Sequence, residues 1–90
     1  MSIDNDDVRL IILDSARKHG ISDKDMLDVA SEPCAYYRIR PEPLKMLLLG
    51  FDSKGRALEV ITDTGHDGQV FIIHADKITK QNAKLLEEVL

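Results

Sequence analysis

The sequence predicts a single α+β domain in which a four-stranded, mainly antiparallel sheet carries two N-terminal helices and one C-terminal helix. Three observations lead to this fold class. Apolar segments of strand length recur through the second half of the chain, helix-like spacing marks both ends, and the connections are short. Short connections favour antiparallel pairing of neighbouring strands. The expected order of elements is therefore α-α-β-β-β-β-α.

Helices are expected before and after the strands. Apolar side chains in residues 7–19 recur at helical spacing, and Gly20 can adopt the left-handed conformation that ends a helix. Ser22 has the pattern of an N-cap for a short second helix, which Pro33 ends. Thr79 is the expected N-cap of the last helix, whose apolar residues share one face.

The strands are expected at residues 34–40, 46–50, 58–63 and 70–75. The second and third form a central hairpin around the turn at residues 53–56, where Gly55 can supply a positive φ. Because the second strand is almost entirely apolar, we expect it to be covered on both faces. The rest of the chain should pack on this hairpin or extend it.

Composition limits the class of protein. Ninety residues form one domain, and the sequence leaves open whether residues 1–6 are ordered. No apolar run approaches the roughly 20 residues of a membrane span, and the acidic N-terminus does not resemble a signal peptide. The single cysteine, Cys34, excludes an internal disulfide and fits a reducing compartment. We therefore expect a cytoplasmic protein without membrane contact.

The charge distribution argues against general nucleic-acid binding. The net charge is −4, whereas phosphate contacts require Lys and Arg. Residues 1–32 carry all of this charge, and residues 33–90 are neutral. This asymmetry permits a local basic patch on the sheet but does not establish one.

The sequence lacks the common cofactor and metal motifs. It has no Walker loop, GxGxxG, HExxH or CxxC, and its three histidines lack the spacing of metal ligands. We therefore predict neither a cofactor nor a metal.

His74 is the most informative polar residue because it follows an apolar strand where a loop is expected. A histidine there can act as general acid or base, or it can be a core-edge residue bonded to backbone. Several cations lie on or beside the predicted sheet, where they form either a phosphate-binding surface or protection for strand edges. They are Arg38, Arg40, Lys45, Arg56, Lys77 and Lys80.

Three segments resemble the BrnT-like toxin family. Residues 18–22, KHGIS, are similar to its KHG-[IV]-[ST] opening, and LLLGFDSKGRALEVITD is similar to its GxxxxGRxLxVVY hairpin. Residues 72–80, IIHADKITK, resemble its IISARxAT segment. The resemblance covers residues 18–82 in order. It implies a RelE-like ribonuclease fold, the toxin half of a type II toxin–antitoxin module, with an antitoxin protein as partner and RNA as substrate.

The resemblance also implies site residues, with one departure. Asp76 stands where the family has arginine, and His74 where it has serine. RelE-like ribonucleases act without metal and use cations to stabilise the developing phosphorane charge. On this basis His74 is the expected general acid or base, Lys77 and Lys45 the phosphate stabilisers. The residues expected to bind RNA are Arg38, Arg56 and Lys80.

A second interpretation is a non-catalytic protein-interaction module on the same scaffold. Its binding surface would be the acidic first helix or an exposed sheet edge. Whether the chain self-associates into a homodimer stays open at this point. A toxin should arrest growth when expressed alone, whereas an interaction module should not.

Overall fold

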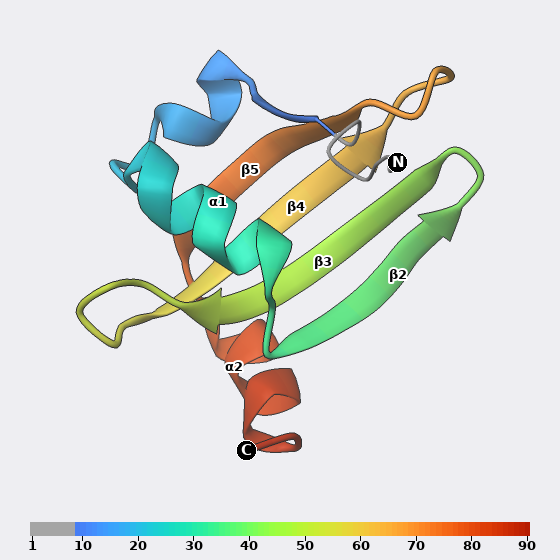
Figure 1. Ribbon diagram of the computed structural model, residues 1–90. Helices are drawn as coiled ribbons and strands as arrows, with labels where there is room; N and C mark the ends of the chain where they lie inside the picture. Colours follow the sequence, from blue (N-terminus) through green and yellow to red (C-terminus); the bar gives the residue numbers. More distant parts are fainter. Residues whose placement is uncertain (1–8) are drawn as a thin grey trace, which may run out of the picture.

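The computed structural model describes residues 9–90 as a five-stranded mixed sheet with helices on both faces (Figure 1). The strands lie in the order β1-β5-β4-β3-β2. The elements are β1 (Leu10–Ile12), the 3-10 helix η2 (Asp14–Arg17), α1 (Asp23–Ser31), β2 (Ala35–Pro41), β3 (Leu44–Phe51), β4 (Ala57–Thr64), β5 (Val70–Lys77) and α2 (Lys80–Glu87). Within the described residues, no helix is long and apolar enough to cross a membrane.

The central hairpin is confirmed. β3 and β4 pair antiparallel from Lys45↔Asp63 to Phe51↔Ala57, and Gly55 in the turn has a φ of 81°. In β3, Leu47, Leu48 and Leu49 are all at most 8% exposed, as expected for a strand covered on both faces. β2 and β5 pair antiparallel with the outer sides of this hairpin.

The predicted first helix is wrong, and the sheet is five-stranded and mixed rather than four-stranded and antiparallel. Leu10–Ile12 form β1, which pairs parallel with Val70 to Ile72 of β5. Only one short 3-10 helix, η2, precedes α1 in the described residues. Backbone pairing with the edge of β5, and packing of Ile12 against the core, outweigh the weak helical spacing of this segment. Residues 1–8 of the expectation lie outside the described residues.

The other helix signals are confirmed. The Ser22 side chain accepts a hydrogen bond from the backbone N–H of Asp25 at the start of α1. The Thr79 side chain does the same for Asn82 at the start of α2. Gly20 has the expected positive φ of 78°, although it follows η2 and not a long helix.

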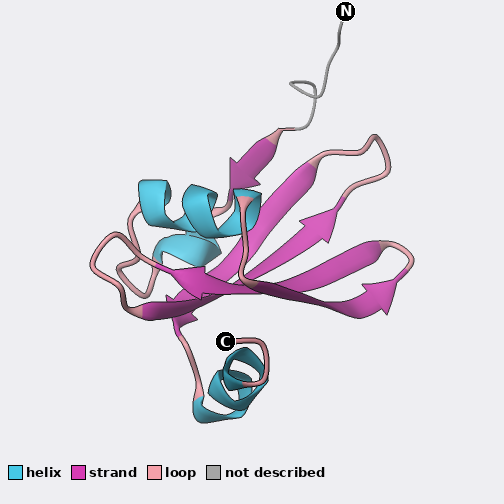
Figure 2. Ribbon diagram, turned by 60° about the horizontal axis from the view of Figure 1, so that its bottom comes forward, coloured by secondary structure: helices cyan, strands magenta, loops and turns pink. Residues whose placement is uncertain are grey.

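The sheet separates two hydrophobic clusters, one under each helix. Figure 2 shows α1 and α2 on opposite sides of the sheet. Under α1, the buried residues include Met26, Val29, Leu48, Leu58, Val60, Ile72 and Ala75. On the other face, Leu86 of α2 packs with Ala35, Leu47 and Leu49. Because α2 is short and lies near one end, this second face is only partly covered.

Candidate acid–base site

A β-bulge in β5 determines which way His74 points. Ile72 and His74 pair with consecutive residues of β4, so Ile73 between them has no partner. Ile72 and Ala75 are both fully buried on the α1 side. With regular alternation His74 would lie on that side too, so the bulge turns it to the opposite face. The unpaired Ile73 carbonyl accepts a hydrogen bond of 3.0 Å from the Ser15 hydroxyl, which ties η2 to the bulge.

Glu59 of β4 is the buried partner of His74. The residue is 5% exposed, and its carboxylate Oε2 lies 2.9 Å from His74 Nε2. Oε1 accepts hydrogen bonds from the Thr79 backbone N–H at 2.8 Å and from Asn82 Nδ2 at 3.0 Å. One carboxyl group therefore joins β4, β5 and the first turn of α2.

The protonation state of Glu59 follows from these contacts. Burial raises the pKa of the Glu59 carboxyl, but the hydrogen bonds from Thr79, His74 and Asn82 outweigh it, so the pKa lies below its usual range. Glu59 is therefore ionised at neutral pH and can only accept hydrogen bonds. His74 must carry a proton on Nε2, and its Nδ1 is the nitrogen left to exchange a proton with a ligand.

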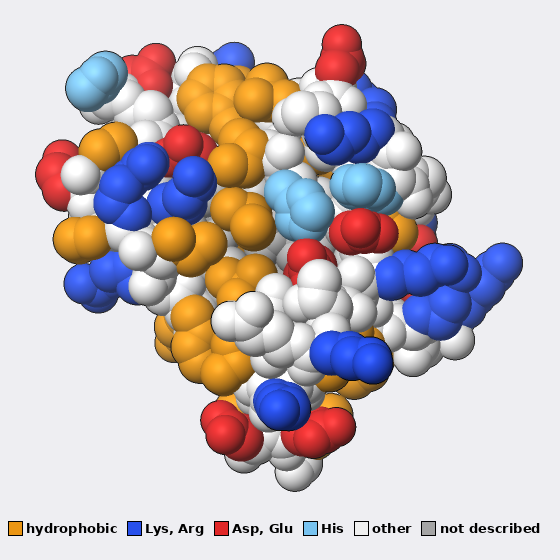
Figure 3. Space-filling view, turned by 180° about the vertical axis from the view of Figure 1, so that it is seen from behind, with side chains coloured by type: hydrophobic (Ala, Val, Ile, Leu, Met, Phe, Trp, Pro, Cys, Tyr) orange, Lys and Arg blue, Asp and Glu red, His pale blue; other side chains and the backbone are white. Residues whose placement is uncertain are grey.

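His19 lies beside His74. The two rings meet edge to face with centroids 5.6 Å apart, and Figure 3 shows two imidazoles side by side on this face. His19 Nδ1 is 3.5 Å from Oδ2 of Asp76, which leaves Nε2 as its free nitrogen. The side chains of His19 and His74 are 36% and 28% exposed, so a ligand in solution can reach both. Each imidazole thus has a carboxylate beside one nitrogen, and the second nitrogen has no hydrogen-bond partner among residues 9–90.

Two of the predicted cations, Lys80 and Lys45, lie on the same side of the sheet as His74. Lys80 begins α2 directly after Thr79, whose N–H is bound to Glu59. Lys45 of β3 lies on the same sheet face as His74, two strands away.

The other predicted cations lie elsewhere. Lys77 pairs with the buried Leu58 and so leaves the sheet on the α1 side, although it is exposed. Arg38 is on the α1 side of β2, at the edge of the sheet. Arg56 forms an ion pair of 2.7 Å with the buried carboxylate of Asp52 at the β3–β4 turn. The structure therefore does not gather the six predicted residues into one site.

The Arg56 guanidinium is engaged in its ion pair with Asp52. Burial raises the pKa of the Asp52 carboxyl, but the Arg56 backbone N–H, the Arg56 guanidinium and the Lys54 N–H outweigh burial and hold that pKa below its usual range. Asp52 therefore stabilises the turn, and the Arg56 charge serves that ion pair.

Sequence reasoning missed His19 and Glu59 as members of the site. His19 belongs to the KHGIS motif, so a signal existed, but nothing placed that motif beside β5. Glu59 occupies an alternating position of a strand, and nothing in the sequence marks it as a partner of His74. Only the fold makes it the partner of His74.

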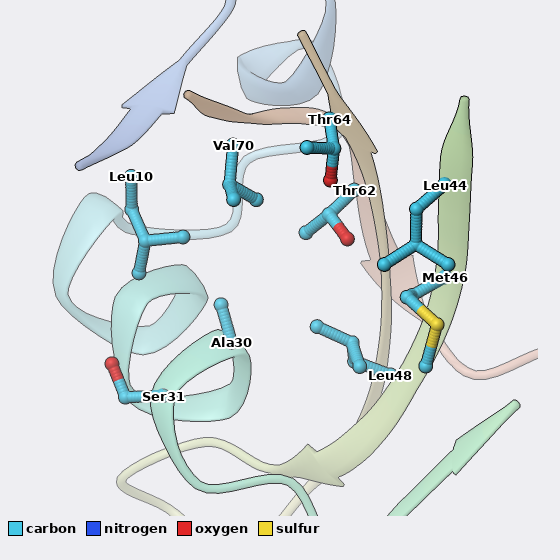
Figure 4. Close-up of a pocket in the computed structure, with 9 residues that line it drawn as sticks. All are labelled: Leu10, Ala30, Ser31, Leu44, Met46, Leu48, Thr62, Thr64 and Val70. Atoms are coloured by element: carbon cyan, nitrogen blue, oxygen red, sulfur yellow. The ribbon is translucent and has the colours of Figure 1, made fainter. Parts of the chain in front are cut away.

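The described residues contain no cluster suited to a metal ion, and two pockets in them lie apart from the acid–base pair. Among residues 9–90, no three His, Cys, Asp or Glu side chains lie close enough to hold a metal ion. A pocket of about 400 Å³ between α1 and the sheet has only the hydroxyls of Ser31, Thr62 and Thr64 as polar side-chain groups (Figure 4). A second pocket of about 260 Å³ is lined by Phe71 and Ile73, among others. Neither pocket contains an acid–base pair.

No protein-family model and no curated protein matches this chain. The similarity to BrnT-like toxins therefore depends on the three short motifs described above.

Proposed function

We propose that this chain is a metal-independent endoribonuclease of the BrnT-like toxin type, neutralised by an antitoxin protein. The observation that carries the proposal is the His19–His74 pair, with a carboxylate beside each imidazole. Cleavage of an RNA phosphodiester needs one group to remove a proton and another to donate one. Two adjacent imidazoles with free nitrogens can supply both without a metal.

The reaction assigns one role to each imidazole. His74 Nδ1 takes the proton of a ribose 2′-hydroxyl, and the 2′-oxygen attacks phosphorus. The bond from phosphorus to the 5′-oxygen breaks, and protonated His19 gives its Nε2 proton to that leaving oxygen. The products are a 2′,3′-cyclic phosphate and a 5′-hydroxyl, and no other reactant is consumed. Glu59 orients His74 and compensates the charge of the imidazolium that forms.

Asp76 is the main electrostatic obstacle, because its charge would repel a phosphate. Its contact with His19 reduces that obstacle, since a protonated imidazole compensates the carboxylate. Lys45 and Lys80 are the cations that we assign to the RNA backbone on this face. Lys77, Arg38 and Arg56 retain their predicted roles only as hypotheses for mutagenesis.

The test is incubation of the purified protein with mixed-sequence single-stranded RNA at low salt in EDTA, followed by a sizing gel. We expect cleavage that falls by about 100-fold or more in His74→Ala and in His19→Ala. His66→Ala, at the exposed β4–β5 turn, is the matched control and should cleave as the parent does. A Lys77→Ala variant tests the predicted phosphate contact. Intact RNA with the parent protein, or full activity in both His19 and His74 variants, would contradict the proposal.

A second candidate is the non-catalytic interaction module. It is favoured by the three hydrogen bonds of Glu59, which give the His74–Glu59 pair a complete structural role in holding α2. Expression without a partner separates the candidates, because a toxin arrests growth and an interaction module does not.

A further inference from the structure

The outer edge of β2 is open in the described part of the protein. β2 is the last strand of the sheet and pairs only with β3 (Figure 1). Its pairing is regular from Ala35 to Arg38, and a register shift follows between Arg38 and Arg40. A regular edge strand presents unpaired N–H and C=O groups, so another extended chain can add to it. Residues 35–38 are the regularly paired part of this edge; Ala35 at its start is buried, whereas Tyr36 and Arg38 are exposed.

Charge indicates what kind of chain would add. Residues 34–45 carry a net charge of +2, although the whole chain carries −4. Arg40 is paired with Asp63 at 2.7 Å, whereas Arg38 is exposed and has no ion pair with any carboxylate of residues 9–90. Beside it, Tyr36 is 69% exposed and offers an aromatic face. Among residues 9–90, the edge therefore combines backbone groups without a strand partner, a cation without an ion pair and exposed apolar area.

We propose that β2 is a docking site for an extended acidic segment of a partner protein, which adds to the sheet as a sixth strand. The segment would hydrogen-bond to the backbone of residues 35–38 and place an acidic side chain next to Arg38. A second copy of this chain would bring another basic β2 to the same edge, so charge favours an acidic partner over self-pairing. This inference does not rest on the acid–base pair, because His74 lies on the α2 side of the sheet, three strands away from β2.

The test is a titration of ¹⁵N-labelled protein with a blocked peptide of alternating Glu and Val, followed by amide chemical shifts to millimolar peptide. We expect shift changes centred on residues 35–38 and at least a fivefold weaker affinity in Arg38→Glu. Lys54→Glu, an exposed cation at the β3–β4 turn, is the matched control and should bind as the parent does. The same spectra show whether each variant is folded. Binding should weaken as salt increases, because surface charges are screened.

Several results would overturn the proposal. They are the absence of shifts at millimolar peptide, shifts centred on another element, and equal binding of a peptide with Lys in place of Glu. Unchanged affinity in Arg38→Glu would do the same. Shifts of residues 35–38 that depend on protein concentration without peptide would show that a second copy, and not an acidic partner, occupies the edge.

Discussion

Replacement of Glu59 by alanine should destabilise the protein more than any change of an exposed acid. The carboxylate accepts hydrogen bonds from His74, the Thr79 backbone and Asn82, all at 3.0 Å or less. Each is worth about 1 kcal/mol net, and charged bonds exceed this value. We therefore expect Glu59→Ala to lower the free energy of unfolding by about 3 kcal/mol. For a domain of this size, that corresponds to a fall in Tm of roughly 15 °C.

The loss should begin at α2, because Glu59 holds its first turn. Urea unfolding followed by circular dichroism measures the free energy, and hydrogen exchange locates the change. We expect amide protection in Lys80–Glu87 to fall before protection in β3 and β4. Glu87→Ala, at an exposed position of the same helix, is the control. A Glu59→Ala protein within about 0.5 kcal/mol of the parent would refute the reasoning, since burial of the carboxylate would then cost as much as its bonds return.

Three further predictions concern pH, packing and capping. Asp52 and Glu59 have pKa values below their usual range in the folded protein, so their stabilisation is present above about pH 4 and is lost as the pH falls through the folded values; urea titrations at pH 3 and pH 6 should show lower stability at pH 3. A Cβ on Gly50 would lie 3.2 Å from Val29, so Gly50→Ala should cost about 1 kcal/mol, and a double-mutant cycle with Val29→Ala should show coupling of similar size. Ser22→Ala removes the N-cap of α1 and should cost about 1 kcal/mol in thermal unfolding, whereas Ser22→Asp should not.

Much of the sheet could be predicted because its signals are local. Strand spacing and Gly55 predict the β3–β4 hairpin, and the side chains of Ser22 and Thr79 mark the helix starts within three residues of what they cap. Such signals do not depend on the rest of the fold. These local signals predict the order of β2 to β5 along the chain and the burial of β3 on both of its faces.

The first strand could not be predicted in this way. Leu10–Ile12 is too short to distinguish strand from helix by spacing, and its partner in β5 is 60 residues away in the register Leu10↔Val70. No sequence pattern marks the bulge at Ile73, although this bulge turns His74 away from α1. His74 could therefore be chosen as a candidate from its place at a strand end, while its partners Glu59 and His19 could not.

Glu59 both holds α2 and orients His74, and Glu59→Gln separates these two roles. The amide oxygen can still accept from Thr79 and Asn82, so α2 should stay docked and stability should fall by about 1 kcal/mol. The amide NH₂ group would then face His74 Nε2, which must accept instead of donate, and the proton would move to Nδ1.

This change removes the nitrogen that we assign as the base. ¹⁵N spectra of the imidazole report the tautomer directly, without any activity assay. We expect a switch of the protonated nitrogen together with a loss of RNA cleavage of about 100-fold, by analogy with other carboxylate-oriented histidines. If the tautomer switches and cleavage is unchanged, His74 is not the base. If the tautomer does not switch, the contact between Glu59 and His74 does not orient the imidazole, and only its role in holding α2 remains.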